Sequence, residues 1–315
     1  MKAVLLNQIT PAEQVALTEV EVPKVQPGWV LVKVKAFGMN HSEQILRLSE
    51  IEADYIRKPI IPGIECVGEV ADTSDSGLTV GQKVIAMMGG MGRSFHGSYA
   101  EYALLPVSHV FAVESGLSWE RLAAVPETYF TAWGSLFECL QLKPDDTLLI
   151  RGATCALGYA AIQIAKALGC KAIATTHRES KLPLLAGVDE AMLDDGPLAG
   201  KVHGVTKALD LVGPKYLRDT LRAVEKGGIV CNTGILGGVF ALNGFDPIKE
   251  IPNGVYLTGF FSNYPMQETV NDIMAFLNKH RLEPMIGASY AFDHIRDACI
   301  ALDGGKVNGK IVVTV

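Results

Sequence analysis

The spacing of apolar residues changes character partway along the chain. Up to about residue 120, short runs with alternating apolar and polar positions are separated by Pro and Gly, which predicts the short strands of a β-rich domain. These runs lie at 30–34, 68–70, 83–86 and 100–103. From residue 121 onward, continuous apolar runs alternate with helical patterns, which is typical of parallel βαβ units.

The second pattern predicts six strands of one parallel sheet. Their continuous apolar character suits strands that are covered by helices on both faces. They lie at 147–150, 171–176, 191–194, 208–212, 228–232 and 255–260. Beyond residue 265, helices at 269–280 and 295–302 and strands at 289–292 and 310–315 form a tail too small to fold alone, so we expect it to return to the first domain.

Composition limits the partners that the chain can have. Its 315 residues exceed the usual size of one core, which predicts two domains. The formal net charge of -6 argues against a nucleic acid or an anionic membrane surface as a partner. The first residues form too brief an apolar run for a signal peptide, and no later run reaches membrane-spanning length. The cysteines are dispersed without a CxxC pair, which is typical of reduced thiols, so we expect a cytoplasmic protein.

A glycine-containing turn follows the first of the six strands. It reads Gly152-x-x-Cys155-x-x-Gly158 and leads into a helical run of small and apolar residues at 159–168. The charge of a nucleotide pyrophosphate is held by free backbone N–H groups at such a helix N-terminus, where bulky side chains would block its approach. The residues expected to contact the nucleotide are Gly152, Thr154, Cys155, Ala156, Leu157 and Gly158. The alternative is an ordinary strand-to-helix turn without a ligand.

The end of the second strand indicates which nicotinamide cofactor binds. An Asp or Glu there accepts from the ribose 2′-hydroxyl of NAD, whereas NADP sites lack the acid and offer cations to the 2′-phosphate. This chain has Thr175 and Thr176 at that place, two hydroxyls able to donate to phosphate. His177, Arg178 and Lys181 follow directly. We therefore expect NADPH as the cofactor.

Motifs along nearly the whole chain resemble those of one family. Residues 38–43 followed by Arg47 look like an Asn-x-x-Asp-x-x-x-Arg element with Glu43 in the acidic place, and residues 62–65 look like a Pro-Gly-x-Glu turn. The helix start at 131–133 and the closing strand at 309–312 are similar as well. Together with the glycine turn, they resemble the zinc-free quinone oxidoreductase (zeta-crystallin-like) branch of the medium-chain dehydrogenase/reductase superfamily.

The resemblance implies an α/β fold of two domains. A GroES-like β-rich catalytic domain would comprise residues 1–120 and 265–315, around a Rossmann domain of residues 121–264 that binds NADPH. Asn40 and Thr131 would lie near the nicotinamide, flanked by backbone that follows the later strands. The flanking residues are Val212, Gly213, Thr233, Gly234, Ile235, Phe260 and Phe261. For the two phenylalanines, packing in the core is an equal alternative.

Zinc ligands are missing where the zinc-dependent members of the resembled superfamily have them. Those relatives place a Cys where this chain has Asn40 and a His where it has Ile64. The region 87–99 lacks the four closely spaced cysteines of their structural zinc lobe. His41 and His96 stand alone, whereas zinc needs several converging donors. We therefore expect no metal.

Without a metal, catalysis depends on how the cofactor is positioned. The cofactor carries the hydride, and the protein aligns it with the acceptor and excludes water. A quinone takes the hydride and then a proton from solvent, whereas an enone or 2-alkenal also needs a donor to its carbonyl. Asn40, Tyr55 and Tyr129 are the candidate donors. The expected function is NADPH-dependent reduction of a quinone or a similar small-molecule electrophile.

Two alternative functions stay open. A 2-alkenal or enoyl reductase of the same fold would differ only in the shape of its pocket. A low-turnover nucleotide-binding or structural protein is the other alternative, because fold alone does not determine function.

An apolar run between the fifth and sixth strands predicts how the chain assembles. Residues 233–242 would leave an apolar sheet edge exposed in a monomer, and proteins normally cover such an edge. In the resembled family two Rossmann sheets join edge to edge, so Val239, Phe240 and Leu242 would pair with their own copies in a homodimer. The alternative is that the run packs under the protein's own loops.

Overall fold

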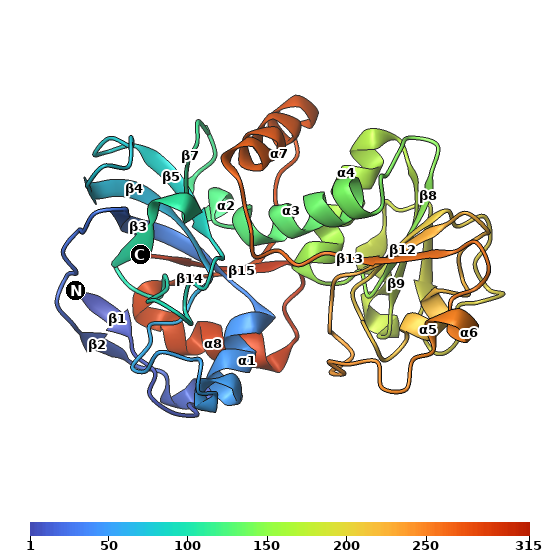
Figure 1. Ribbon diagram of the computed structural model, residues 1–315, viewed down its shortest axis with the longest axis horizontal. Coiled ribbons are helices and arrows are strands. Elements are labelled where there is room, and N and C mark those ends of the chain that lie inside the picture. The colour runs from blue at the N-terminus through green and yellow to red at the C-terminus, as the bar shows by residue number, and fades with distance from the viewer. The chain divides into compact units, whose positions relative to one another are not determined.

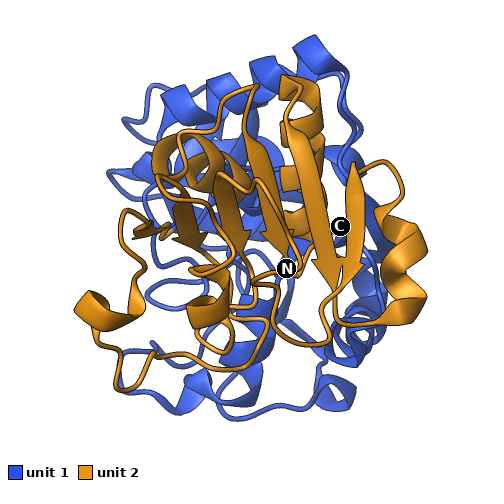
Figure 2. Cartoon of the chain, turned by 90° about the vertical axis from the view of Figure 1, so that its right-hand side faces the viewer, with its two compact units in different colours: residues 1–130, 262–315 blue, residues 131–261 orange.

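The computed structural model describes all 315 residues, which form two compact units. Unit 1 comprises Met1–Phe130 and Ser262–Val315, and unit 2 comprises Thr131–Phe261 (Figure 2). Sequence analysis placed the boundaries at 120 and 265 instead. The first boundary lies later than predicted because residues up to Phe130 are bonded into unit 1. There the N–H of Glu127 donates to the buried carboxylate of Glu65 at 2.8 Å.

A seven-stranded sheet is the centre of unit 1. Its strands are β3 (Trp29–Met39), β4 (Glu65–Thr73), β5 (Lys83–Met87), β6 (Tyr102–Pro106), β7 (Val110–Ala112), β14 (Ile286–Ala291) and β15 (Lys310–Thr314), and β1 (Lys2–Val4) and β2 (Leu17–Glu19) form a separate pair. The order is β14-β15-β3-β4-β5-β7, with β6 paired to β3 (Figure 1). Because β15 pairs antiparallel with β3, the C-terminal tail is part of this unit.

Aromatic side chains pack the core of unit 1 around β3, which is buried along most of its length. Phe37 stacks on Tyr99 with ring centroids 4.5 Å apart, and Phe292 meets Phe37 edge-on at 5.9 Å. The helices are α1 (His41–Leu48), α2 (Trp119–Leu122), α3 (Pro126–Trp133), which continues into unit 2, α7 (Gln267–His280) and α8 (Ile295–Gly304). Short helical turns are η1 (Ala12–Gln14), η2 (Glu50–Glu52), η3 (Val107–His109) and η6 (Phe292–His294).

Six parallel strands form the sheet of unit 2. They are β8 (Thr147–Arg151), β9 (Lys171–Thr176), β10 (Glu190–Leu193), β11 (Lys207–Asp210), β12 (Ile229–Asn232) and β13 (Tyr256–Gly259). Their spatial order, β10-β9-β8-β11-β12-β13, is that of a doubly wound Rossmann sheet. The predicted parallel sheet and the α/β fold class are confirmed. The helical segments are η4 (Gly134–Cys139), α4 (Ala156–Leu168), η5 (Glu179–Leu185), α5 (Leu217–Thr220) and α6 (Pro247–Glu250).

Two strands of unit 1 lie a few residues from their predicted places. The strand predicted at 100–103 is found at Tyr102–Pro106, because Ala100 forms an isolated bridge with Ala3 and the register with β3 starts only at Tyr102. The strand predicted at 289–292 is found at Ile286–Ala291, because the chain turns into η6 at Phe292.

The predicted sheet edge at 233–242 is wrong. This run is an irregular loop after β12, and the edge of the sheet is β13, whose Tyr256 is 61% exposed. Glycines interrupt the run, and Gly238 has a φ of +71°, which is incompatible with a strand. Phe240 in this loop is 67% exposed, so it does not pack under the protein's own loops either.

No helix combines the length and the apolar character that a membrane span requires.

Candidate functional site

The turn between β8 and α4 has the geometry that its glycine pattern predicts. Gly152 has a φ of +82°, a conformation that side chains rarely adopt. Cys155 caps α4, and its Sγ accepts a hydrogen bond from the N–H of Gly158 at 3.4 Å. Cys155 has an ordinary extended backbone, with a φ of -138°, so the cysteine stands there without backbone strain.

Close packing explains the glycine at the start of α4. A Cβ at Gly158 would lie 2.2 Å from the carbonyl oxygen of Ala153, so only glycine fits there. The first-turn N–H groups of a helix have no intrahelical acceptors and bear partial positive charge. The turn therefore brings Gly152, Thr154, Cys155, Ala156, Leu157 and Gly158 together in an arrangement suited to a pyrophosphate.

The two threonines at the end of β9 hold this turn in place. The Thr175 hydroxyl accepts from the N–H of Gly152 at 3.1 Å, and the hydroxyls of Thr154 and Thr176 lie 3.1 Å apart. Thr175 and Thr176 are 0% and 1% exposed. This differs from the expectation that both hydroxyls donate to phosphate, because burial and these internal hydrogen bonds commit them to the protein.

Positive charge gathers just beyond β9, around the imidazole of His177. Nε of Arg178 donates to this ring at 3.2 Å. Burial lowers the pKa of His177, and the charges of Arg178, Lys181 and Lys215 lower it further, while Asp194 acts in the opposite direction. Burial and the charge of Arg178 likewise lower the pKa of Lys181. These cations suit a phosphate group.

Sequence reasoning missed Lys215. It lies in the loop after β11, which is remote from β9 in the chain, and nothing in its local sequence indicates a shared site with Arg178. Both loops lie at the same end of the parallel sheet, because the carboxyl ends of all its strands lie there.

The loops after β11 and β12 touch each other, as expected for the flank of a nicotinamide. The carboxylate of Asp210 accepts from the N–H groups of Val212 and Gly213 at 2.9 and 2.8 Å. A Cβ at Gly213 would lie 2.3 Å from the carbonyl oxygen of Gly234. The structure therefore brings together the predicted residues Val212, Gly213, Thr233, Gly234 and Ile235.

The two phenylalanines after β13 have different surroundings. The Phe260 ring covers Gly134 so closely that a Cβ there would lie 2.0 Å from it. Phe261 is 72% exposed. Thr131 is buried, and its carbonyl oxygen accepts from the hydroxyl of Ser135 at 2.7 Å. Phe260 thus packs on Gly134 but is only half-buried, so its place beside a nicotinamide stays a prediction.

In unit 1, Asn40 directs its side chain toward buried charges. Its Nδ2 donates to Glu65 at 2.8 Å and, more weakly, to Glu43 at 3.4 Å. Its Oδ1 accepts from Nζ of Lys310 at 2.6 Å. Because the whole amide is engaged within the protein, Asn40 does not offer a donor to a substrate carbonyl in this structure.

Lys310 carries the central charge of this cluster. Its Nζ lies 2.6 Å from Glu65 and donates to Thr128 at 2.9 Å in addition to Asn40, so its three N–H groups have three acceptors. Burial opposes the charge of Lys310, but the carboxylates of Glu65 and Glu127 more than compensate and raise its pKa. Sequence reasoning did not single out this pair, although a lysine in an otherwise apolar closing strand indicates a buried partner.

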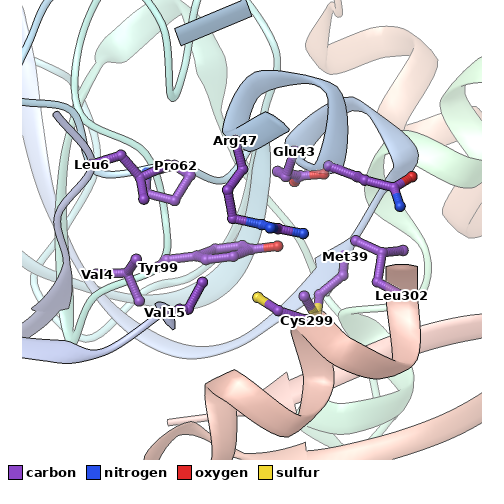
Figure 3. Close-up of a pocket in the computed structure, with 11 residues that line it drawn as sticks. Val4, Leu6, Val15, Met39, Glu43, Arg47, Pro62, Tyr99, Cys299 and Leu302 are labelled. Atoms are coloured by element: carbon purple, nitrogen blue, oxygen red, sulfur yellow. The ribbon is translucent and has the colours of Figure 1, made fainter. Parts of the chain in front are cut away.

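A small cavity lies beside this cluster. α1 and α8 are neighbours, and Glu43 and Arg47 of α1 line the cavity together with Tyr99 and Cys299 (Figure 3). The cavity volume is about 10 Å³, enough for a water molecule and too small for a substrate. Burial and the carboxylate of Glu65 raise the pKa of Glu43 to about 7.

The two candidate tyrosines are not placed alike. Tyr55 is 67% exposed and donates to Glu50 at 2.9 Å, a bond that raises its pKa. Tyr129 is 2% exposed, and burial raises its pKa. A hydride acceptor that takes its proton from water needs neither of them.

Two family models match the chain. The alcohol dehydrogenase GroES-like domain matches residues 26–115, and the zinc-binding dehydrogenase matches residues 187–313. The predicted GroES-like domain is therefore confirmed. The quinone oxidoreductase of Rattus norvegicus is 27% identical over 331 residues, which cover 99% of this chain and 97% of the relative.

Solved structures resemble the whole fold. The structure of an NAD-dependent alcohol dehydrogenase has a TM-score of 0.86 at 25% identity, over 100% of both chains. That of the yhdH oxidoreductase from Salmonella enterica in complex with NADP has a TM-score of 0.85 at 24% identity, over 100% of both chains. The name of the first of these structures contains NAD and that of the second contains NADP. These two structures therefore do not decide between the cofactors, and the choice between them depends on this chain's own residues.

The residues of this chain do not fit the zinc that one family model names. No group of three or more His, Cys, Asp or Glu side chains is arranged to hold a metal ion. His41 is exposed, and Nδ1 of His96 accepts from the N–H of Ile61 at 3.2 Å. At Asn40 the ammonium of Lys310 provides the positive charge instead.

Proposed function

Because the chain belongs to the quinone oxidoreductase branch of the medium-chain dehydrogenase/reductase superfamily, we propose that it reduces quinones or similar small electrophiles with NADPH, and without zinc. The chain is an oxidoreductase, and NAD(P) dependence agrees with its Rossmann sheet and glycine turn.

The observation that carries the proposal is the charge at the end of β9. β9 ends in Thr175 and Thr176 where an NAD site has an acid, and the cations Arg178, Lys181 and Lys215 lie around His177. A 2′-phosphate carries up to two negative charges and is stabilised by such a group of cations, whereas a 2′-hydroxyl gains little from it.

The bound nicotinamide supplies the hydride in this chemistry. The chain's own residues bind and orient it. The turn from Gly152 to Gly158 would hold the pyrophosphate by backbone N–H groups, and the cations beyond β9 would hold the 2′-phosphate. Asp210 fixes the loop at Gly213 by accepting hydrogen bonds from two backbone N–H groups, and this fixed loop would help to orient the nicotinamide.

The proton that completes the reduction comes from water in this proposal. The side chain of Asn40 is hydrogen-bonded to Glu65 and Lys310. The hydroxyl of Tyr55 is hydrogen-bonded to Glu50, and Tyr129 is buried. A quinone needs no donor at the moment of hydride transfer, whereas an enal gains from one. This favours the quinone over the 2-alkenal or enoyl reductase alternative.

Steady-state oxidation of NADPH against a panel of quinones, 2-alkenals and enoyl thioesters tests the acceptor. The proposal predicts the highest kcat/KM with quinones. Faster turnover of alkenals or thioesters would replace it with the reductase alternative. Tight NADPH binding without turnover of any acceptor would support the low-turnover nucleotide-binding alternative.

We also propose that the protein is a cytoplasmic homodimer. All six cysteines are free thiols, which fits a reducing compartment. The unpaired edge of β13 with its exposed Tyr256, and the exposed Phe240 in the neighbouring loop, suit contact with a second copy across a two-fold axis.

A further inference from the structure

A buried arginine connects the ends of β8 and β10 to α5. Arg151 is the last residue of β8 and is 0% exposed. Its Nε and Nη2 donate to the two carboxylate oxygens of Asp194, each at 2.8 Å. Its Nη1 donates to Asp219 at 2.7 Å and to Thr220 at 3.1 Å. With a weaker contact of 3.4 Å from Nη2 to the carbonyl oxygen of Gly196, all five N–H groups have acceptors.

Asp194 lies next to the strand end where the adenosine ribose would bind. Its N–H donates to the carbonyl oxygen of Thr176 at 2.8 Å, and the Thr175 hydroxyl lies 3.5 Å from its carboxylate. The same hydroxyl accepts from the N–H of Gly152 in the nucleotide turn at 3.1 Å. The chain thus has an acid beside this site, although β9 itself ends without one. A carboxylate here without its counter-charge would repel a 2′-phosphate and disfavour NADPH relative to NADH.

Resting on the proposed use of NADPH, we propose that Arg151 is a positioning residue that sets the cofactor preference by neutralising Asp194. The two hydrogen bonds give each carboxylate oxygen of Asp194 a charged donor, so the guanidinium offsets the negative charge of this carboxylate. Arg151 offsets the charge of Asp194 toward a 2′-phosphate, although Asp219 shares the same guanidinium and leaves the three residues with one net negative charge. Arg151 acts only through Asp194, since its own donors are all engaged within the protein.

A purely structural role makes a different prediction. In that case Arg151 only fastens β10 and α5 to β8, and its loss would weaken NADPH and NADH binding to the same extent. The ratio of the two dissociation constants therefore separates the two roles, whatever happens to overall affinity.

The test is a fluorescence titration of each protein with NADPH and with NADH. Arg151→Gln should shift the ratio of dissociation constants toward NADH by about tenfold, because Asp194 regains a free charge. Adding Asp194→Asn to that variant should restore the wild-type ratio to within about twofold, because the freed charge is gone. Asp194→Asn alone should shift the ratio toward NADPH by about threefold, since Asp219 still offsets part of the charge of Arg151.

Asp219→Asn is the matched control. It removes a carboxylate from the same guanidinium, but one that accepts from the N–H groups of Leu198 and Ala199 at 2.8 and 3.3 Å and not one beside β9. Its ratio should stay within about twofold of wild type, because Asp194 and not Asp219 is hydrogen-bonded to the end of β9. A shift as large as that of Asp194→Asn would overturn the proposal in favour of a general charge effect.

An unchanged ratio in both Arg151→Gln and Asp194→Asn would overturn the role of Arg151. Arg151→Gln leaves buried carboxylates without their partner; if it fails to fold, Asp194→Asn decides alone, with an unchanged ratio counting against the proposal. Failure of the proposed function is a separate result: a wild-type protein that binds NADH more tightly than NADPH. The shifts relative to wild type still test Arg151 in that case.

Discussion

Replacement of Glu43 by Gln tests whether this buried carboxyl stays protonated near neutral pH. Glu43 is 3% exposed, and burial together with the carboxylate of Glu65 raises its pKa from 4.5 to about 7. Gln has nearly the same shape as the protonated carboxyl but does not titrate. The unfolded chain exposes Glu43 to water, where its pKa returns to the ordinary value.

The direction of the effect follows from the two pKa values. Between 4.5 and about 7 the folded protein keeps a proton that the unfolded chain has released, so the folded state is increasingly disfavoured as the pH rises. Below this window Glu43 is protonated in both the folded and the unfolded state. Above it Glu43 is ionised in both states, and the full destabilisation of the folded state remains. At about 1.4 kcal/mol for each pKa unit, the shift from 4.5 to about 7 destabilises the folded state by about 3.5 kcal/mol at high pH.

Urea unfolding followed by tryptophan fluorescence, from about pH 5 to about pH 8, measures this penalty. The wild-type free energy of unfolding should fall by about 2.5 kcal/mol relative to that of Glu43→Gln across this range. Asp210, whose pKa burial also raises, is present in both proteins and cancels in the difference. Glu52→Gln, at an exposed carboxyl, controls for the loss of one negative charge. Parallel curves for wild type and Glu43→Gln would refute the reasoning.

Four further outcomes are expected. Arg178→Ala with Lys181→Ala should weaken NADPH binding more than NADH binding by about 2 to 4 kcal/mol in a fluorescence titration, and equal weakening would remove the 2′-phosphate assignment. Elemental analysis should find no stoichiometric zinc, and activity should persist in EDTA; activity that is lost in EDTA and restored by zinc would contradict the zinc-free proposal. Phe240→Asp should shift a wild-type dimer toward monomer in sedimentation velocity, because it replaces an exposed apolar side chain of the proposed interface with a charge; a wild-type monomer, or a variant that stays a stable dimer, would place the interface elsewhere. Lys310→Met should lower the free energy of unfolding by about 3 to 5 kcal/mol in urea, because it leaves Glu65 buried and unpaired, and a loss below about 1 kcal/mol would show that the cluster is not needed.

The sheet of unit 2 could be predicted from the sequence because its signal is local. The central strands β8, β9, β11 and β12 carry buried apolar runs, whereas the edge strands β10 and β13 are partly exposed. The glycine turn at Gly152 and Gly158 marks where the first helix begins. The conformation of Gly152 and the contact between Gly158 and Ala153 show why those glycines stand there. Edge strands were less predictable, because a neighbouring strand decides their ends, as Ala3 does for Ala100.

The hydrogen bonds and ion pairs of the buried side chains could not be predicted, since they join residues that are far apart in the chain. The pairs Arg151 with Asp194 and Lys310 with Glu65 are separated by at least 43 positions. A charged residue at the end of an apolar strand indicates that a partner exists, but not which residue it is. For the same reason, the sequence showed Asn40 as a candidate donor without showing that its amide is already engaged.

A comparison of kcat/KM for NADPH and for NADH with the best quinone acceptor tests the central claim most directly. The cations beyond β9 predict that NADPH is preferred by at least about tenfold, equivalent to roughly 1.4 kcal/mol of additional transition-state stabilisation. Equal values for the two cofactors, or a preference for NADH, would contradict the account.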